Sequence, residues 1–334
     1  MTTAGHPGDA RQMLRVSLLF LLLLAGCDCG GGAAAERRTI AMIPKGTTHV
    51  FWRSVHAGAL RAANELNVDL LWQGPQREDD RAGQIRVVED MITRHVDAIA
   101  LAPLDAIALV PVAREASDEG IPVIVFDSGM SWPGLVSFVA TDNRAGGALA
   151  AERLGTLLGG RGRVMVMRYQ EGSDSTAQRE AGFLEALARR YPQIELVSSN
   201  QYGGATTETA YATAESLLVR FTEIDGVFTP NESTTFGMLR ALDDAGRART
   251  VRLVGFDANE AMVAALRDGR IHGLVLQNPE RMGELAVRTA VAKLNGQPVE
   301  ARIDTGATMV TRENMDSPPV HRLLAPDLSI LDRH

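Results

Sequence analysis

The chain has 334 residues, of which 45% are hydrophobic and 22% charged, so it is long enough for two α/β domains with substantial cores. Its formal net charge is −7, and the sequence contains neither a basic cluster nor an RNA-binding aromatic motif. Because phosphate contacts need clustered Lys and Arg, this balance argues against a nucleic-acid partner.

The first 26 residues predict a secretory signal. Arg11 and Arg15 precede a short apolar run, Val16–Ala25, which ends in small residues. At about ten residues this run is shorter than the ~20 residues that a membrane-spanning helix needs. The alternative for this stretch is a buried N-terminal helix.

The sequence Leu-Ala-Gly-Cys at 24–27 resembles the lipobox of bacterial lipoproteins at all four positions. The resemblance implies cleavage before Cys27 and lipidation of its sulfur and amine, and more than one acyl chain suits stable anchoring. Asp28 resembles the signal that retains lipoproteins in the inner membrane of enteric bacteria. Residues 27–37 then form a flexible tether. With Cys27 lipidated, the only other cysteine, Cys29, has no internal partner.

From Thr39 onward, strand and helix patterns alternate, as in parallel sheets built from βαβ units. The predicted strands are 39–43, 68–72, 98–101, 121–127, 137–140, 163–167, 194–198, 226–229, 251–256, 271–276 and a short one near 308–310. The predicted helices are 51–66, 80–94, 106–118, 176–190, 208–221, 233–244 and 279–295.

Two of these strands, far apart in the chain, both end in Phe-Asp. Ile121–Asp127 and Val251–Asp257 are mostly runs of apolar, often β-branched residues, which are typical of strands buried on both faces. Each carboxylate therefore lies at the carboxyl end of a core strand, the edge where open α/β sheets bind ligands. We expect two similar domains that face each other across a ligand-binding cleft.

The doubled pattern predicts an α/β fold of two doubly wound, Rossmann-like parallel-sheet domains joined by a multi-strand hinge. Residues 141–143 form the first crossing between domains, and the helix and short strand after Gln277 indicate that the chain crosses back. The expected parts are an N-terminal lobe of 38–142 and 278–306, a C-terminal lobe of 143–277 and 307–316, and a tail of 317–334.

Aromatic and acidic side chains at strand ends are the first candidate binding residues. Phe51 and Trp52 follow the first strand and could stack on the C–H face of a sugar, although both could instead fill a helix–sheet seam. Asp127 and Asp257 could accept hydrogen bonds from hydroxyl groups; the alternative for each is a helix cap or a turn residue.

Basic and amide side chains complete the candidate set. Arg179 could project into the cleft or remain a solvated helix charge. Asn231 and Gln277 follow or end predicted strands, and each amide could offer a donor and an acceptor or simply be a turn residue. His49 lies in a strand-end loop. The histidines lack the close pairing of a metal site, and no phosphate-binding loop or nucleophile elbow occurs in the sequence, so neither metal nor cofactor is expected.

Together these residues resemble the type I periplasmic binding proteins, in particular the ribose-binding group of ABC-transporter sugar receptors. The resemblance covers about residues 38–315, and its motifs are Val-Ile-Val-Phe-Asp at 123–127, Thr-Asp-Asn at 141–143, Gly146-Gly147, Gln-Arg-Glu-Ala-Gly-Phe at 178–183, Asn231-Glu232, Val-Gly-Phe-Asp at 254–257 and Gln277. It implies a receptor, not an enzyme, that closes over a sugar or polyol and delivers it to a membrane permease. A monomer suits such a shuttle, and the signal and lipobox predict that it is exported and lipid-anchored.

The matching positions imply the ligand site. Phe51 and Trp52 would stack on the sugar, and Tyr202 would add an aromatic from the second domain. The hydrogen-bonding residues would be His49, Asp127, Arg179, Asn231, Asp257 and Gln277.

Two residues depart from the ribose pattern. Ser128 stands where ribose receptors commonly place an Arg, and His49 stands where an Asn is common. Both changes remove contacts expected for ribose, which weakens the case for ribose within the sugar and polyol class. The acidic loop at 77–80 is interpreted as a solvated turn at the rim of the cleft, with ligand choice as its alternative role.

Three other classes of protein compete with a transport receptor. A transcription regulator of the lac-repressor type shares the fold, but here a signal and lipobox occupy the place of its DNA-binding segment. A receptor that presents a sugar or furanose signal to a sensor kinase or chemoreceptor fits the sequence equally well. A hydrolase that uses Asp127 and Asp257 as a carboxylate pair is disfavoured, because the resemblance implies binding only.

Overall fold

The computed structural model describes residues 1–5 and 37–333. The remainder of the predicted secretory signal, the lipidation site Cys27 and nearly all of the tether at 27–37 lie outside the described residues. Residues 38–334 form one compact unit by their internal contacts. Within the described ranges, no helix is both long enough and apolar enough to cross a bilayer.

Six parallel strands form the first sheet, in the order β11-β5-β4-β3-β1-β2. They are β1 (Thr39–Ile43), β2 (Asp69–Trp72), β3 (Ala98–Leu101), β4 (Val123–Phe126), β5 (Ser137–Ala140) and β11 (Arg302–Asp304). Every residue of β3 and β4 is buried, as expected for continuous apolar runs in a sheet that is covered on both faces.

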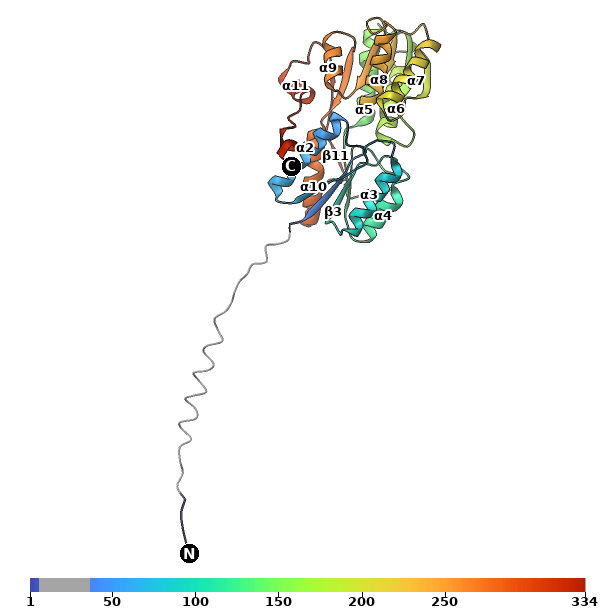
Figure 1. Cartoon of the computed structure of the whole chain (residues 1–334). Helices are drawn as coiled ribbons and strands as arrows, with labels where there is room; N and C mark the ends of the chain where they lie inside the picture. The colour runs from blue at the N-terminus through green and yellow to red at the C-terminus, as the bar shows by residue number, and fades with distance from the viewer. Residues whose placement is uncertain (6–36, 334) are drawn as a thin grey trace. The chain divides into compact units, whose positions relative to one another are not determined.

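Helices cover both faces of this sheet (Figure 1). They are α2 (Val50–Leu66), α3 (Arg81–Thr93), α4 (Val110–Asp118) and α10 (Pro279–Leu294). Alternate residues of β1 point to opposite faces: Ile40 and Met42 join a core cluster with α2 and α10, whereas Ala41 and Ile43 join one with α3 and α4. This sheet and its four helices are called the first lobe.

The second sheet repeats the arrangement in the order β12-β10-β9-β8-β6-β7, with only β12 antiparallel to its neighbour. Its strands are β6 (Arg161–Arg168), β7 (Gln193–Tyr202), β8 (Gly226–Phe228), β9 (Arg252–Phe256), β10 (Gly273–Gln277) and β12 (Ala307–Val310). Its helices are α5 (Asn143–Leu157), α6 (Asp174–Arg190), α7 (Thr207–Arg220), α8 (Glu232–Asp244) and α9 (Glu260–Arg267). Helices α5 and α6 pack on one face and α7, α8 and α9 on the other. These elements are called the second lobe.

The chain passes between the lobes three times, from β5 to α5, from β10 to α10 and from β11 to β12. Two buried threonines link the first and third crossings, because the hydroxyls of Thr141 and Thr305 are hydrogen-bonded at 3.3 Å. The predicted fold class, two doubly wound α/β domains joined by several strands, is confirmed.

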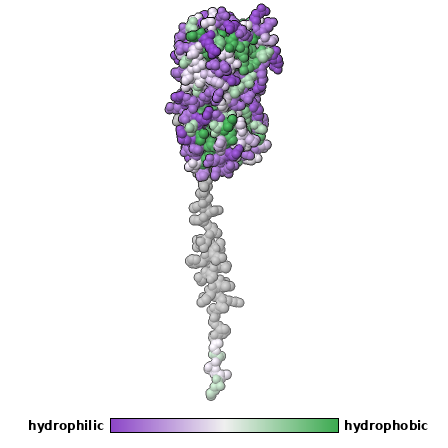
Figure 2. Space-filling model, turned by 90° about the vertical axis from the view of Figure 1, so that its right-hand side faces the viewer, coloured by the Kyte–Doolittle hydropathy of each residue, from purple (hydrophilic) through white to green (hydrophobic). Residues whose placement is uncertain are grey.

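The face drawn in Figure 2 is mainly hydrophilic, with smaller hydrophobic areas.

The local differences from the sequence prediction have physical causes. The helix predicted at 106–118 begins only at Val110, because the Asp105 side chain accepts hydrogen bonds from the backbone N–H groups of Ile107 and Ala108 and holds a turn there. Helices α5 and α9 were not predicted. Helix α5 contains three glycines, which lower its intrinsic helix propensity.

The glycines of α5 allow close contact with α6. A Cβ atom on Gly147 would lie 1.9 Å from the carbonyl oxygen of Arg179, so a side chain at this position would push the two helices apart. Because α6 carries Arg179, this contact also fixes the position of a predicted binding residue.

We therefore predict that Gly147→Ala destabilises the protein by about 1–3 kcal/mol in urea denaturation, because the added methyl group overlaps backbone. Helix propensity alone predicts the opposite sign, a gain of roughly 0.5–1 kcal/mol. The matched control is Ala145→Ser on the exposed face of the same helix, which we expect to change stability by less than about 0.5 kcal/mol. A stabilised Gly147→Ala variant would contradict the packing described above.

Candidate functional site

Residues at the carboxyl ends of parallel strands from both lobes line a polar cavity that is partly open to solvent. The lining residues come from both lobes: Lys45, His49, Phe51, Trp52, Glu78, Asp127, Tyr169, Ser175, Thr176, Arg179, Asn231, Glu232, Asp257 and Gln277.

Eight of the nine residues predicted to bind ligand line this cavity. The ninth, Tyr202, lies at the end of the edge strand β7, where its side chain is 37% exposed and its hydroxyl accepts a hydrogen bond from Arg168 at 3.0 Å. Because β7 is the outermost strand of its sheet, its carboxyl end lies away from the central strands that reach the cavity.

Asp127 and Asp257 adopt the same unusual backbone conformation. Each directly follows the Phe that ends a core strand, and each has φ of 60°, in the left-handed region that Asp tolerates better than most residues. This conformation ends the strand and leaves a buried carboxylate at its carboxyl end. The same local solution therefore places one acid from each lobe at the cavity.

Lys45 neutralises Asp127. Its ammonium group lies 3.2 Å from the carboxylate, and both side chains are almost fully buried. The same group donates hydrogen bonds across the cleft to the hydroxyls of Ser173 and Ser175, at 3.3 and 3.0 Å. Lys45 was not among the predicted binding residues, although it follows the first strand directly after Pro44.

The Glu78 carboxylate, whose side chain is only 10% exposed, connects three groups at the cavity wall. His49 Nδ1 lies 2.9 Å from its Oε1, the Trp52 indole N–H donates to the same oxygen at 2.6 Å, and the Tyr169 hydroxyl donates to Oε2 at 2.5 Å. The interpretation of the 77–80 loop as a solvated turn is therefore wrong at Glu78. Side chains from distant segments cover Glu78, and no local sequence pattern indicates these contacts.

The charges of Glu78 and His49 stabilise each other. Burial opposes the imidazolium, but the charge and hydrogen bond of Glu78 outweigh it and raise the pKa of His49 to about 9. Burial likewise opposes the Glu78 carboxylate, whereas the charge and hydrogen bond of His49, with a contribution from Lys45, lower its pKa to about 2. The pair is therefore ionised at neutral pH.

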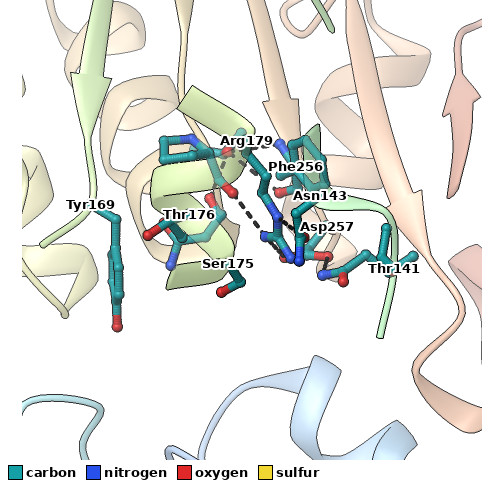
Figure 3. Close-up of polar contacts among 12 residues, drawn as sticks. Thr141, Asn143, Tyr169, Ser175, Thr176, Arg179, Phe256 and Asp257 are labelled. Atoms are coloured by element: carbon teal, nitrogen blue, oxygen red, sulfur yellow. Dashed lines mark hydrogen bonds and ion pairs between the residues drawn. The ribbon is translucent and has the colours of Figure 1, made fainter. Parts of the chain in front are cut away.

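Arg179 organises the second lobe's side of the cavity (Figure 3). Its guanidinium donates to Asn143 Oδ1 at 2.8 Å and to the carbonyl oxygen of Pro230 at 2.9 Å, lies 3.7 Å from Asp257, and stacks 4.3 Å above the Phe256 ring. The Asp257 carboxylate also accepts a hydrogen bond from Gln277 at 2.9 Å. Arg179 is thus a buried cation paired with Asp257, and not a solvated helix charge.

Two cavity-lining side chains have oxygens without a hydrogen-bond partner among the described residues. They are Oε2 of Glu232 and Oε1 of Gln277, and both atoms are buried. Asn231, by contrast, caps α8 through its own Oδ1, which accepts from the backbone N–H of Thr234 at 3.3 Å. Asn231 therefore both lines the cavity and caps a helix.

The aromatic pair forms the remaining wall. Phe51 and Trp52 meet edge to face, with ring centroids 4.8 Å apart, and their side chains are 9% and 2% exposed. The ring centroids of Trp52 and Phe126 lie 6.3 Å apart, so Trp52 joins the core of the first lobe while its N–H donates to Glu78. Phe51 and Trp52 therefore pack in the seam between helix and sheet and also line the cavity, so each of the two roles considered for them describes part of their surroundings.

Further contacts join the lobes at the cleft. Ser128 is fully buried and its hydroxyl accepts from the backbone N–H of Ser175 at 3.1 Å, while the N–H of Gly129 donates to Asp174 at 3.2 Å. Ser128, which replaces the Arg of ribose receptors, therefore links the lobes instead of lining the cavity. Across residues 1–5 and 37–333, no group of three His, Cys, Asp or Glu side chains could hold a metal ion.

Fold and site together define a two-lobed binding protein whose ligand site lies between the lobes. The sequence model of one protein family, the periplasmic binding protein domain, matches residues 40–298. The chain belongs to this family. The similarity confirms the predicted class: a sugar receptor of ABC transporters, exported to the periplasm, and not an enzyme.

Similar proteins cover most of the chain. The D-ribose/D-allose-binding protein of Pseudomonas aeruginosa is 32% identical over 277 residues, which are 80% of this chain and 86% of that protein. A carbohydrate transporter solute-binding protein from Agrobacterium radiobacter, solved with D-arabinose, is 33% identical with a TM-score of 0.84, covering 87% of this chain and all of that one. The periplasmic component of a sugar transport system from Hahella chejuensis is 38% identical with a TM-score of 0.79, covering 81% and 99%.

The His49–Glu78 pair predicts a pH window for stability. The raised pKa of His49 contributes stability that is complete below pH 6.5 and is lost as pH rises through 9. The lowered pKa of Glu78 contributes stability that is complete above pH 4.5 and is lost as pH falls through 2. Glu78→Gln should therefore destabilise the protein most between pH 4.5 and 6.5, by about 1–3 kcal/mol. Denaturation curves across pH measure this difference.

The same variant should lower the pKa of His49 toward 6.5, as seen by NMR titration of its imidazole. Asp79→Asn is the control, because this neighbouring acid is much more exposed and is not a cause of the His49 shift. An unchanged His49 pKa in Glu78→Gln would show that the pair is not the source of the shift.

Glu232 should affect stability in the opposite sense to Glu78, because its pKa is raised and not lowered. Burial raises its pKa to about 7 from 4.5, with nearby Asp257 adding to the rise and His49 opposing it. Ionisation of Glu232 between these pH values therefore opposes folding. We expect Glu232→Gln to gain stability relative to the parent protein as pH rises from 4.5 to 7, measured by thermal unfolding. Glu260→Gln, at an exposed helix start, should show no such trend.

Proposed function

We propose that the cavity binds a neutral monosaccharide or polyol. The observation that carries this proposal is charge matching: Lys45, His49 and Arg179 each lie within 4 Å of a carboxylate, at Asp127, Glu78 and Asp257. A sugar acid would find no unpaired cation among the described lining residues. A neutral ligand adds no charge to this balance, and its hydroxyls both donate and accept hydrogen bonds.

The predicted binding residues have different roles, which follow from the chemistry of their side chains. Phe51 and Trp52 offer apolar ring surface to the C–H groups of the ligand. Asp127, Asp257 and Gln277 accept from its hydroxyls, whereas Arg179 and the amide of Asn231 donate to them. Because closure of the lobes over the ligand excludes bulk water, a sugar that lacks one matching hydroxyl leaves a buried group unpaired, at a cost of roughly 1–3 kcal/mol. Specificity arises from this cost.

Related proteins indicate which ligands to test first. Their names specify D-ribose and D-allose in Pseudomonas aeruginosa and xylitol in Mycolicibacterium smegmatis, and solved structures contain D-arabinose and D-fucose. All of these are uncharged pentoses, hexoses or polyols, in agreement with the matched charges of the cavity. In this chain the ligand enters between open lobes, which then close over it by rotation at the three crossings.

The proposal extends to cellular context. The closed receptor delivers its ligand to the permease of an ABC transporter. Cys27 carries the lipid anchor that holds the protein at the membrane, facing the periplasm or the extracellular side, and the 27–37 segment acts as the tether. The receptor works as a monomer, since closure around the ligand needs only the two lobes of one chain.

A thermal-shift screen tests the ligand class. A panel of pentoses, hexoses, polyols and matching sugar acids is added to the protein, and a ligand at ~100 times its dissociation constant should stabilise by about 2.7 kcal/mol. We expect a neutral sugar or polyol to raise the melting temperature and its acid form not to. Stabilisation by a sugar acid alone would contradict the charge-matching argument.

Asp127→Asn should abolish or strongly weaken the response. Asn tolerates the left-handed backbone of Asp127, so the end of the strand keeps its conformation while the carboxylate is lost. Asp90→Asn, on the exposed surface of α3, is the matched control and should respond like the parent protein. An unchanged response in Asp127→Asn would place the ligand outside this cavity.

A further inference from the structure

The C-terminal segment is more than the tail that the sequence suggested. It consists of α11 (Pro318–Leu324), the connecting residues 325–328 and the 3₁₀-helix η1 (Ser329–Arg333), here called the strap. The strap lies beyond residues 40–298, which match the family model. Figure 1 shows it running from the side of the second lobe near α9 to α2 of the first lobe.

One end of the strap is anchored in the second lobe. Val320 is 6% exposed and belongs to the core cluster that α7, α8 and α9 form with their sheet, and Leu323 and Leu324 pack against the same cluster. Just before the strap, Met315 is buried in this core. These apolar contacts make α11 a part of the second lobe.

The other end is anchored on the first lobe. Arg61 of α2 donates through Nη2 to the carbonyl oxygen of Asp327 at 2.5 Å, and its guanidinium also pairs with Glu280 in the first turn of α10. Helix η1 contacts α2 directly. Arg61 therefore joins the strap to the two helices of the first lobe that lie next to the β10–α10 crossing.

Between its anchors the strap passes behind the ligand site. Leu323, Leu324 and Pro326 line a second pocket, whose other walls include Phe51, Asp257 and Gln277. The latter three residues also line the proposed ligand cavity. The strap thus backs the same side chains that face the ligand.

The strap's connection is too short to follow a large movement of the lobes. Four residues, 325–328, join α11 to η1, and a fully extended chain of that length spans at most ~14 Å. If rotation changes the separation of the two anchors, either the Arg61 contact or the packing of Leu323 and Leu324 has to break. Both are present in the arrangement in which the lobes touch across the cleft.

We propose that the strap is an additional tie between the lobes, which favours the closed arrangement and thereby raises ligand affinity. Its effect on affinity rests on the proposed function, whereas its effect on lobe closure does not. A tie that stabilises the binding-competent arrangement increases the fraction of protein ready to hold ligand, and apparent affinity rises in proportion.

The chain's lysines provide a measurement of closure that needs no ligand. Lys45 and Lys293 are the two lysines of the sequence; the first is buried at the cleft, with a side chain 4% exposed, and the second is exposed. The rate of Lys45 acetylation by an amine-reactive reagent, followed by mass spectrometry and divided by the rate at Lys293, therefore reports cleft opening.

Two variants of the full chain test the strap. One ends at Leu324, which removes the connection and η1 but keeps the apolar anchor, and the other is Arg61→Ala. We expect each to raise the relative acetylation of Lys45 by at least about fivefold, the lower end of typical conformational couplings. Arg53→Ala, an exposed arginine earlier on α2, is the matched control and should leave the rate unchanged.

Two outcomes would overturn the proposal. Unchanged Lys45 labelling in both variants, with far-UV circular dichroism and cooperative unfolding like the parent protein, would show that the strap ties nothing. Slower labelling would show that the strap holds the lobes apart. Because acetylation is measured without ligand, either result is independent of whether the sugar screen finds a ligand.

Discussion

Buried charges between the two lobes require partners, and this requirement determines how the lobes meet. Lys45 and Glu78 both belong to the first lobe, and each has a charged partner there, in Asp127 and His49. Glu78 also accepts from Trp52 of the first lobe, and further hydrogen bonds come from the second lobe, between Lys45 and two serine hydroxyls and from the hydroxyl of Tyr169 to Glu78. A buried charge is costly unless its hydrogen bonds are complete. The closed arrangement completes them with protein groups, so closure and charge satisfaction are one event.

The position of these charges follows from the polarity of parallel strands. All strands of a parallel sheet end at the same edge, so residues that follow different strands converge there. Asp127 and Asp257 use this geometry identically, since each follows a Phe and adopts φ of 60°. Strain of this kind persists only where the surroundings fix it. Lys45 and the Gln277 side chain provide that fixation, one in each lobe.

This geometry also explains what the sequence could predict. Uninterrupted apolar runs identified the core strands, and the two Phe-Asp endings identified the edge where the cavity lies, because both signals are local. Glu78 could not be found in this way: it lies in a run of Arg, Glu, Asp and Asp that looks like a solvated turn, and only contacts with His49, Trp52 and Tyr169 bury it. Helix α5 was missed because its glycines serve its packing on α6 at the expense of helix propensity.

The two lobes contribute differently to the cavity. Carboxylates of the first lobe already have cations beside them, whereas the unpartnered oxygens of Glu232 and Gln277 both belong to the second lobe. An unpaired buried acceptor costs roughly 1–3 kcal/mol, and a ligand hydroxyl that donates to it removes this cost. Under the proposed function, the first lobe therefore offers a rigid, prepaired surface with two aromatic rings, and the second lobe gains most from closing over the ligand. Free energy released at the second lobe is then available to drive closure.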